Sequence, residues 1–302
     1  MRPQRIWYTE DSGKGVSTLF QNIQHFSHTQ KPVNEDACGF GRSFLFVLDG
    51  ATGLGKREFM HAGSDAHWLS GSIRDRLLKE LPQGADPIIV LKEELYRLRS
   101  QYLQAARTMP SAAEAPSACI ALFYERGDWL YYFGMGDCYG VVELKNGQVE
   151  VISDPILEEL DQQALMRMKE ISRIQQIPFF EARRQIQELL MHNRMCRNQP
   201  GGYHALDLEW DRLEEIEIHQ WKKSDVHRVL CASDGFYEIM NYGIVDNPKE
   251  LMDQLRLHGQ EVVQWLFSAQ DADAQAERCP RFKHRDDCTY VYAETEEQKC
   301  SG

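Results

Sequence analysis

The sequence predicts an α+β fold in which sheets are covered by helices. Short runs rich in β-branched and aromatic residues predict strands, and these runs come in groups. Segments with helical periodicity lie between the groups, in pairs or longer blocks. This alternation fits layers of sheet covered by helices better than the regular strand-helix alternation of a parallel sheet.

Seven runs predict strands, at residues 44–48, 118–124, 129–135, 139–144, 149–152, 226–232 and 289–293. Turn residues that suit positive φ separate two pairs of these runs, at Arg126-Gly127-Asp128 and at Lys145-Asn146-Gly147. We therefore expect an antiparallel meander from about residue 118 to residue 152.

Helical periodicity covers three blocks, at residues 61–81 joined to 87–107, at 156–193 with a break at Pro178, and at 248–271. The middle block is polar and ends in the turn signal Pro200-Gly201-Gly202. We expect residues 155–202 to be a helical insertion in a single domain, residues 1–295, followed by a polar tail, residues 296–302.

The composition excludes several classes of protein. The 302 residues are 42% hydrophobic, enough for a large core, and the net charge of −12 argues against a broad nucleic-acid interface. No apolar run follows Arg2 and Arg5, and no stretch is long enough to cross a bilayer. The eight cysteines lack zinc-site spacing and predict free thiols. We expect a cytoplasmic protein that binds neither membrane nor nucleic acid.

Carboxylates follow directly on several of the predicted strands. Two apolar runs end in the same dipeptide, Asp49-Gly50 and Asp234-Gly235. A third run ends in Gly136-Asp137, and Asp286-Asp287 comes just before a fourth. Carboxylates at strand ends can meet at one edge of a sheet, where burial without a cation or a metal ion is costly.

These motifs contain no lysine or arginine other than Arg285, so we expect metal ions to balance the charge. Carboxylate, carbonyl and water oxygens suit magnesium and manganese, and two such ions could share Asp49. A glycine after Asp49 and after Asp234 is expected to let the backbone turn sharply and to leave a carbonyl available to an ion.

Five motifs in order resemble those of the type 2C metal-dependent protein serine/threonine phosphatases, as a bacterial-type member. They are Asn34-Glu35-Asp36-Ala37, Val47-Leu48-Asp49-Gly50-Ala51-Thr52-Gly53, Gly136-Asp137-Cys138, Ala232-Ser233-Asp234-Gly235 and Asp286-Asp287-Cys288-Thr289. The resemblance spans about residue 15 to residue 293. It implies an αββα sandwich, two antiparallel sheets face to face with helix pairs outside and metals at one end.

The resemblance also implies roles for individual residues. Asp49 would bridge two Mn²⁺ or Mg²⁺ ions, Asp234 and Asp286 would complete the first, and Glu35 with the Gly50 carbonyl would hold the second. Asp137 matches a third, looser metal position shared with Asp234. The implied reaction is hydrolysis of phosphoserine and phosphothreonine in proteins, by direct attack of a water that bridges the metals at Asp49 and Asp234. The partners are then a phosphoprotein and a cognate kinase, with the enzyme a monomer.

Two departures from the family pattern affect the substrate site. Lys31 stands where members often have an arginine that grips the substrate phosphate, and lysine binds phosphate only as a point charge. Ala51 stands where eukaryotic members place a histidine, so the leaving-group proton must come from elsewhere, with His61 one candidate. We expect Lys31 to contact the phosphate, with weaker affinity or a changed substrate choice.

Alternatives remain open at this point. An inactive pseudophosphatase that serves as a regulatory binding module would tolerate the changes at Lys31 and Ala51. A two-metal phosphatase could also act on a non-protein phosphoester. The cations His192, Arg194 and Arg197, near the end of the insertion, could meet a phosphorylated substrate, but a solvated helix end is the simpler interpretation.

Overall fold

The computed structural model describes residues 19–55 and 57–296. One sheet has the strand order β1 (Phe20–His28), β11 (Cys288–Thr295), β10 (Val226–Ala232), β6 (Tyr139–Leu144) and β7 (Val149–Ile152). The second has the order β2 (Ala37–Phe40), β3 (Phe44–Ala51), β4 (Ser117–Arg126), β5 (Trp129–Met135) and β9 (Ile218–Lys222), and β8 (Leu206–Asp207) pairs with β4. The strand pairs are antiparallel.

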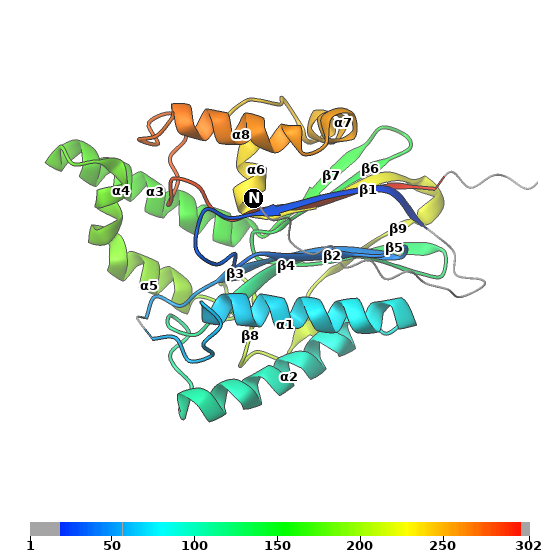
Figure 1. The fold of residues 1–302 in the computed structure, drawn as a ribbon, viewed down its shortest axis with the longest axis horizontal. Coiled ribbons are helices and arrows are strands. Elements are labelled where there is room, and N and C mark those ends of the chain that lie inside the picture. Colours follow the sequence, from blue (N-terminus) through cyan, green and yellow to red (C-terminus); the bar gives the residue numbers. More distant parts are fainter. Residues whose placement is uncertain (1–18, 56, 297–302) are drawn as a thin grey trace, which may run out of the picture.

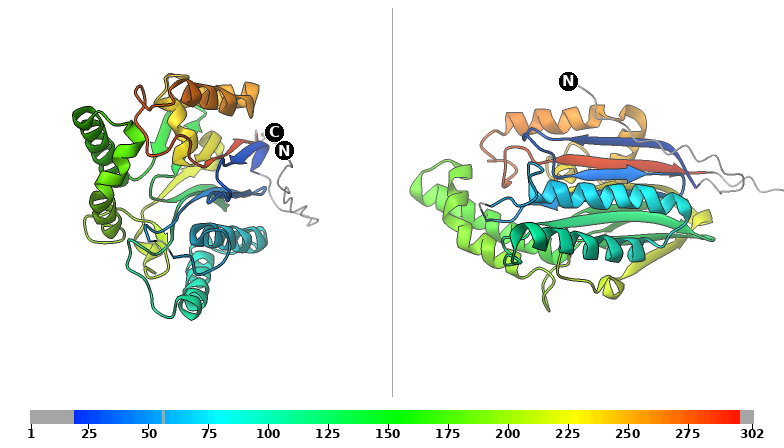
Figure 2. Two further views of the ribbon diagram at one scale, coloured as in Figure 1. Left: turned by 60° about the vertical axis from the view of Figure 1, so that its left-hand side comes forward. Right: turned by 60° about the horizontal axis from the view of Figure 1, so that its bottom comes forward.

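Helix pairs cover the outer faces of both sheets (Figures 1 and 2). The second sheet carries α1 (Asp65–Glu80) and α2 (Pro87–Ala106), and the first carries α7 (Pro248–His258) and α8 (Glu261–Ala272). Three helices lie at one end of the sheets, α3 (Pro155–Gln175), α4 (Phe179–Ala182) and α5 (Gln187–Met195). The short elements are α6 (Asp234–Tyr237), η1 (Leu81–Gln83), η2 (Arg183–Ile186), η3 (Leu213–Glu215), η4 (Lys223–Asp225) and η5 (Glu238–Met240).

Alternation along the strands builds the layers, because successive side chains of a strand point to opposite faces of its sheet. In β3, Phe44, Phe46 and Leu48 pack against α1 and α2, whereas Leu45 and Val47 pack between the two sheets. Both faces of these strands are therefore buried, as the continuous apolar runs predict. The predicted αββα sandwich is confirmed.

Three of the long helices begin in the same way. The side chains of Asp86, Asp154 and Asn247 accept hydrogen bonds from the first backbone N–H groups of α2, α3 and α7. Each of these residues is followed by a proline, which suits the first helical position because its missing N–H has no partner there. These Asx-Pro pairs set where the helices start.

The seven predicted strands and both predicted hairpins are confirmed. The predicted meander is wrong, because β4 and β5 belong to one sheet and β6 and β7 to the other. The chain crosses between the sheets at residues 136–138, where Gly136 has a positive φ of 73°. The structure also adds strands that were not predicted, β1, β2, β8 and β9.

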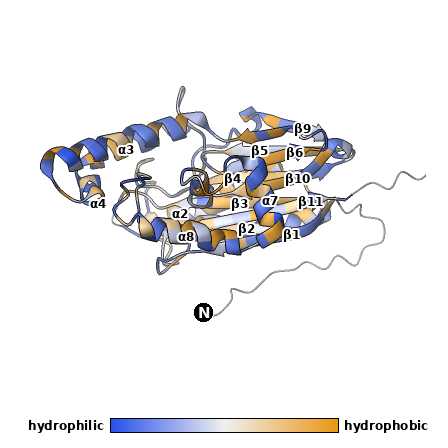
Figure 3. Ribbon diagram, turned by 90° about the horizontal axis from the view of Figure 1, so that it is seen from above, coloured by the Kyte–Doolittle hydropathy of each residue, from blue (hydrophilic) through white to orange (hydrophobic). Residues whose placement is uncertain are grey.

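The segment from α3 to α5 has a small apolar cluster of its own, which includes Met168, Ile171, Phe179 and Ile186. Hydrophilic residues make up much of helix α3, whereas the strands of the sandwich are more hydrophobic (Figure 3). None of the helices in the described part of the chain is long and apolar enough to span a bilayer.

Candidate active site

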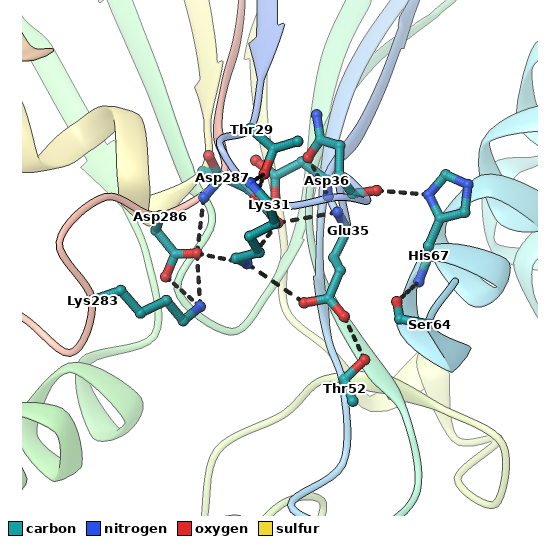
Figure 4. A network of polar contacts seen from close by, with 12 residues as sticks. Thr29, Lys31, Glu35, Asp36, Thr52, Ser64, His67, Lys283, Asp286 and Asp287 are labelled. Carbon is teal, nitrogen blue, oxygen red and sulfur yellow. Dashed lines mark hydrogen bonds and ion pairs between the residues drawn. The ribbon is translucent and has the colours of Figure 1, made fainter. Parts of the chain in front are cut away.

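The residues predicted for the site lie where strands end or cross, and they share a pocket lining with residues of α3 and α5. Figure 4 shows three of them, Lys31, Glu35 and Asp286. Strand β3 carries Asp49 near its end, and α6 begins at Asp234 directly after β10. Asp137 lies in the crossing from β5 to β6, and Asp286 lies just before β11. The connection from β1 to β2 supplies Lys31 and Glu35.

One pocket of about 640 Å³ contains every residue predicted for the site. Its lining includes Lys31, Glu35, Asp49, Gly50, Asp137, Asp234 and Asp286. The segment from α3 to α5, residues 155–195, is called the helical segment below. It supplies further lining residues, Leu157, Asp161, Arg183, Leu190, Asn193 and Arg194. The metal and substrate roles of the seven residues stay predictions, but their convergence is a property of the structure.

The glycines after Asp49 and Asp234 are required for a different reason from the one we expected. Neither has a positive φ, so neither makes a turn that only glycine allows. A Cβ on Gly50 would lie 2.4 Å from the carbonyl oxygen of Glu35, and one on Gly235 would lie 2.1 Å from that of Asp287. Glycine thus lets two pairs of motifs approach each other closely.

Two lysines balance part of the negative charge (Figure 4). Lys31 Nζ lies 2.9 Å from Asp287 Oδ2, 3.2 Å from Asp286 Oδ1 and 3.6 Å from Glu35 Oε2. Lys283 Nζ donates to both oxygens of Asp286, at 2.7 and 2.6 Å. Burial raises the pKa of Asp286, but the two lysines outweigh it and hold that pKa below its usual value. Lys31 was predicted to contact the phosphate and not to balance these carboxylates, and Lys283 was missed.

The other carboxylates have no such partner. Burial raises the pKa of Asp49 well above its usual value, and repulsion from Asp36, Asp234 and Asp137 raises it further. Burial also raises the pKa of Asp234 well above its usual value, and repulsion from Asp137 and Asp286 adds to this effect. Burial likewise raises the pKa of Asp137. Ionisation of these three carboxyl groups is therefore unfavourable unless a cation enters the pocket.

Asp36, which lies within one of the motifs, was not predicted as a site residue and does not line the pocket, but its charge acts on Asp49. It is only 5% exposed, and neither of its carboxylate oxygens accepts a hydrogen bond. Burial and the charge of Asp287 raise its pKa to about 7, against a smaller opposing effect of the nearby hydroxyls of Thr289 and Ser233. Its position beside Glu35 was the only sequence signal that could have identified it.

The donor set fits a divalent cation in its chemistry, because it consists of carboxylate and carbonyl oxygens. The orphaned oxygens of Asp36 and the cost of ionising Asp49 and Asp234 without a cation support that fit. Within the described residues no three His, Cys, Asp or Glu side chains form a metal-holding group as they stand. Two of the carboxylates, Asp286 and Glu35, contact Lys283 and Lys31 instead.

The metal-free protein is expected to lose stability as pH rises from about 4 to about 7. Burial raises the pKa of Asp161 and of Glu238 to about 7, as it does for Asp36. A raised folded-state pKa contributes stability that is present at low pH and lost as pH rises through that value. Melting in excess chelator should give a Tm about 5 °C higher at pH 5 than at pH 7.5.

Asp161→Asn provides the matched control for this pH dependence, because it removes one titrating group without changing its volume. The difference in Tm between the two pH values should shrink in this variant. A Tm that is flat or rises between pH 5 and pH 7.5 in the native chain would contradict the assignment.

The expected solvated helix end is wrong for Arg194 and Arg197, whereas His192 is exposed. Arg197 is 2% exposed and forms an ion pair with Asp207 at 3.0 Å. Arg194 donates to the carbonyl oxygens of Thr52 and Ala51, at 2.8 and 2.6 Å. Both side chains turn into the protein because the helical segment packs against the end of the sandwich. His61, a candidate proton donor, is exposed and lies outside the pocket lining.

The family model of protein phosphatase 2C matches residues 26–275. The chain belongs to the protein phosphatase 2C family, which confirms the resemblance read from the motifs and the class of enzyme, a metal-dependent protein phosphatase. No curated protein matches the sequence significantly.

Solved structures of bacterial phosphatases share the fold. Serine/threonine phosphatase Stp1 from Staphylococcus aureus aligns with a TM-score of 0.55 and 14% identity over 95% of this chain and 100% of that chain. PstP from Mycobacterium tuberculosis aligns with a TM-score of 0.55 and 16% identity over 92% and 100%. The catalytic domain of PstP in complex with two manganese ions aligns with a TM-score of 0.54 and 16% identity, over 92% of this chain and 99% of that chain. At these identities the likeness concerns the fold.

Proposed function

We propose that this chain hydrolyses phosphoserine and phosphothreonine in phosphoproteins, with two Mn²⁺ or Mg²⁺ ions held in the pocket at the end of the sandwich. One observation carries the proposal. Asp49, Asp137 and Asp234 come from three separate parts of the chain, share one pocket, and have pKa values that burial raises. A buried cluster of this kind costs stability unless it serves to bind a cation.

The proposed ligands follow from the family motifs and from the geometry together. Asp49 would bridge the two ions, with Asp234 and Asp286 on one of them. Glu35 and the carbonyl of Gly50 would hold the other, and the Cα of Gly50 already packs against the backbone of Glu35. Asp137 is proposed as part of a third, looser position with Asp234.

The residues around the ligands have orienting roles. Thr52 donates its hydroxyl hydrogen bond to the carboxylate of Glu35, and Ser70 donates to the backbone carbonyl of Glu35 at 2.6 Å. Both the side chain and the backbone of Glu35 are therefore fixed by hydrogen bonds. Thr29 donates to Asp287, which also accepts from the backbone N–H of Glu35 at 3.0 Å. Divalent ions would lower the pKa of water and stabilise the phosphoryl oxygens. Lys31, within the pocket, adds a point charge for the phosphate.

Hydrolysis of p-nitrophenyl phosphate at neutral pH tests the proposal directly. Turnover should require added manganese or magnesium, should stop in excess chelator, and should be absent in Asp234→Ala. Manganese at about 100 times its Kd should also stabilise the native chain by about 2.7 kcal/mol, because it binds only the folded protein. No turnover with any metal, in folded protein, would favour the pseudophosphatase.

The substrate class needs its own comparison. A panel of phosphopeptides, a phosphodiester and small phosphorylated metabolites should show cleavage of the phosphopeptides. Cleavage of the diester alone would overturn the phosphoprotein proposal while leaving the two-metal site intact.

Partner and location form a secondary part of the proposal. A phosphoprotein substrate implies a serine/threonine kinase that produces it, and we propose a monomeric enzyme with one domain over residues 1–295. The seven cysteines in the described ranges are free thiols, which supports a reducing compartment such as the cytoplasm. The proposal includes no nucleic-acid or membrane partner.

A further inference from the structure

Four cationic side chains line the pocket, Lys31, Lys283, Arg183 and Arg194. The two lysines are balanced by carboxylates of the site, since each forms ion pairs with Asp286 and Lys31 also contacts Glu35 and Asp287. The positive charges of the two lysines are therefore balanced by carboxylates of the protein itself. The arginines, which both come from the helical segment, differ from them in this respect.

Arg194 has no acidic partner. Its Nη1 donates to Thr52 O at 2.8 Å, and its Nη2 donates to Ala51 O at 2.6 Å and to Ser117 Oγ at 3.4 Å. Among the residues that the structure describes, no carboxylate lies within ion-pair distance of it. Burial and the neighbouring charge of Arg197 lower its pKa to about 10. A guanidinium held by neutral carbonyls in this way retains its attraction for an anion.

The neighbouring arginine provides the comparison. Arg197 follows Arg194 by about one helical turn, and its charge is balanced by Asp207 at 3.0 Å. Asp207 also accepts a hydrogen bond from Asn198 at 2.9 Å, so that pair is a closed structural contact. Arg194 lacks such a counter-charge and lines the pocket, where Arg197 does not. The ion pair with Asp207 gives the charge of Arg197 a structural role, whereas the charge of Arg194 has no such structural role.

The carbonyls that hold Arg194 place it beside the proposed metal ligands. Ala51 and Thr52 directly follow Gly50, and Thr52 also donates its hydroxyl to Glu35. The guanidinium therefore lies on the side of the pocket formed by Gly50 and Glu35. Its contacts leave further N–H groups able to donate, because a guanidinium carries more donors than these contacts use.

We infer that Arg194 binds the phosphate of the substrate and does so in place of the arginine that the family often has at position 31. The inference rests on the proposed function, since it assigns a residue to the same reaction. A guanidinium presents a planar fork that matches phosphate oxygens, whereas the ammonium of Lys31 is a point charge already surrounded by carboxylates. The helical segment would thereby complete the substrate site.

The test compares the binding of inorganic phosphate and of Mn²⁺ by calorimetry in the full chain, with phosphate titrated into manganese-loaded protein. Arg194→Ala should weaken phosphate binding about 10- to 100-fold, the effect of removing a charged hydrogen-bond donor. Arg194→Lys keeps the charge but not the planar guanidinium, so its phosphate affinity should lie between those of the native chain and Arg194→Ala. Arg184→Ala serves as the control, because Arg184 is exposed in the same segment and lies outside the pocket lining.

Manganese affinity separates recognition of phosphate from a structural role. It should change less than about twofold in Arg194→Lys, and added methylguanidinium should restore phosphate binding to Arg194→Ala. Unchanged phosphate affinity in both variants overturns the inference. A parallel fall of manganese and phosphate affinity also overturns it, since Arg194 would then only order residues 51–52. Phosphate binding without turnover in the native chain would contradict the proposed function but not this inference.

Discussion

Asp49→Asn is expected to lower kcat/KM for p-nitrophenyl phosphate by about 1,000-fold or more, because each tenfold loss needs only about 1.4 kcal/mol of transition-state stabilisation. Asparagine keeps the volume and one oxygen of the side chain but removes the charge proposed to bridge two ions. Steady-state kinetics at saturating manganese measure the change, and calorimetry should show weakened manganese binding.

The same substitution should not destabilise the metal-free protein. The pKa of Asp49 is raised because its charge is unfavourable there, so its removal should leave Tm in excess chelator equal or higher. The stabilisation by manganese should largely disappear. Asp128→Asn is the matched control, since Asp128 is exposed in the turn between β4 and β5. Native-like turnover in Asp49→Asn would rule out the bridging role.

Gly235→Ala is expected to destabilise the chain by about 3 kcal/mol, at the upper end of the cost of overpacking. The added Cβ would lie 2.1 Å from the carbonyl oxygen of Asp287 and 3.2 Å from the Cβ of Asp286. Backbone atoms must then move, and the movement separates Asp234 from Asp286. We expect activity to fall at least about 100-fold, through misplacement of two proposed ligands.

Chemical denaturation gives the free energy of unfolding for this comparison. Gly71→Ala is the control, because Gly71 lies within α1 and its Cβ would meet only the end of Arg74, at 4.0 Å. Alanine there should stabilise the chain by about 0.5–1 kcal/mol, as expected for an ordinary helix position. If Gly235→Ala were as stable and active as the native chain, the close approach would not be a constraint.

Most elements of the fold could be predicted because their patterns are strong. Strands such as β3 and β10 are buried on both faces and give continuous apolar runs. Strands β1 and β9 were missed because they are mostly half-buried or exposed and carry many polar residues. Their sequences satisfy the sheet's hydrogen bonding without a hydrophobic signal, so local composition does not distinguish them from loops.

The same limit applies to the crossing at Asp137. Turn residues predict that two strands pair as a hairpin, and this held for β4 with β5 and for β6 with β7. They do not reveal whether consecutive hairpins share a sheet. The chain instead passes from one sheet to the other at Gly136, which brings Asp137 into the pocket.

The sequence by itself predicted which residues of the motifs would meet in one pocket, since Asp-Gly pairs after apolar strands recur in a recognisable order. Only the tertiary structure decided which cationic side chains lie beside these motifs. Lys283 pairs with Asp286 within one loop, whereas Arg194 reaches Ala51 across 143 positions of the chain. Backbone periodicity reports burial, but ion pairing depends on the distance between side chains from separate elements, and only the packed layers set that distance.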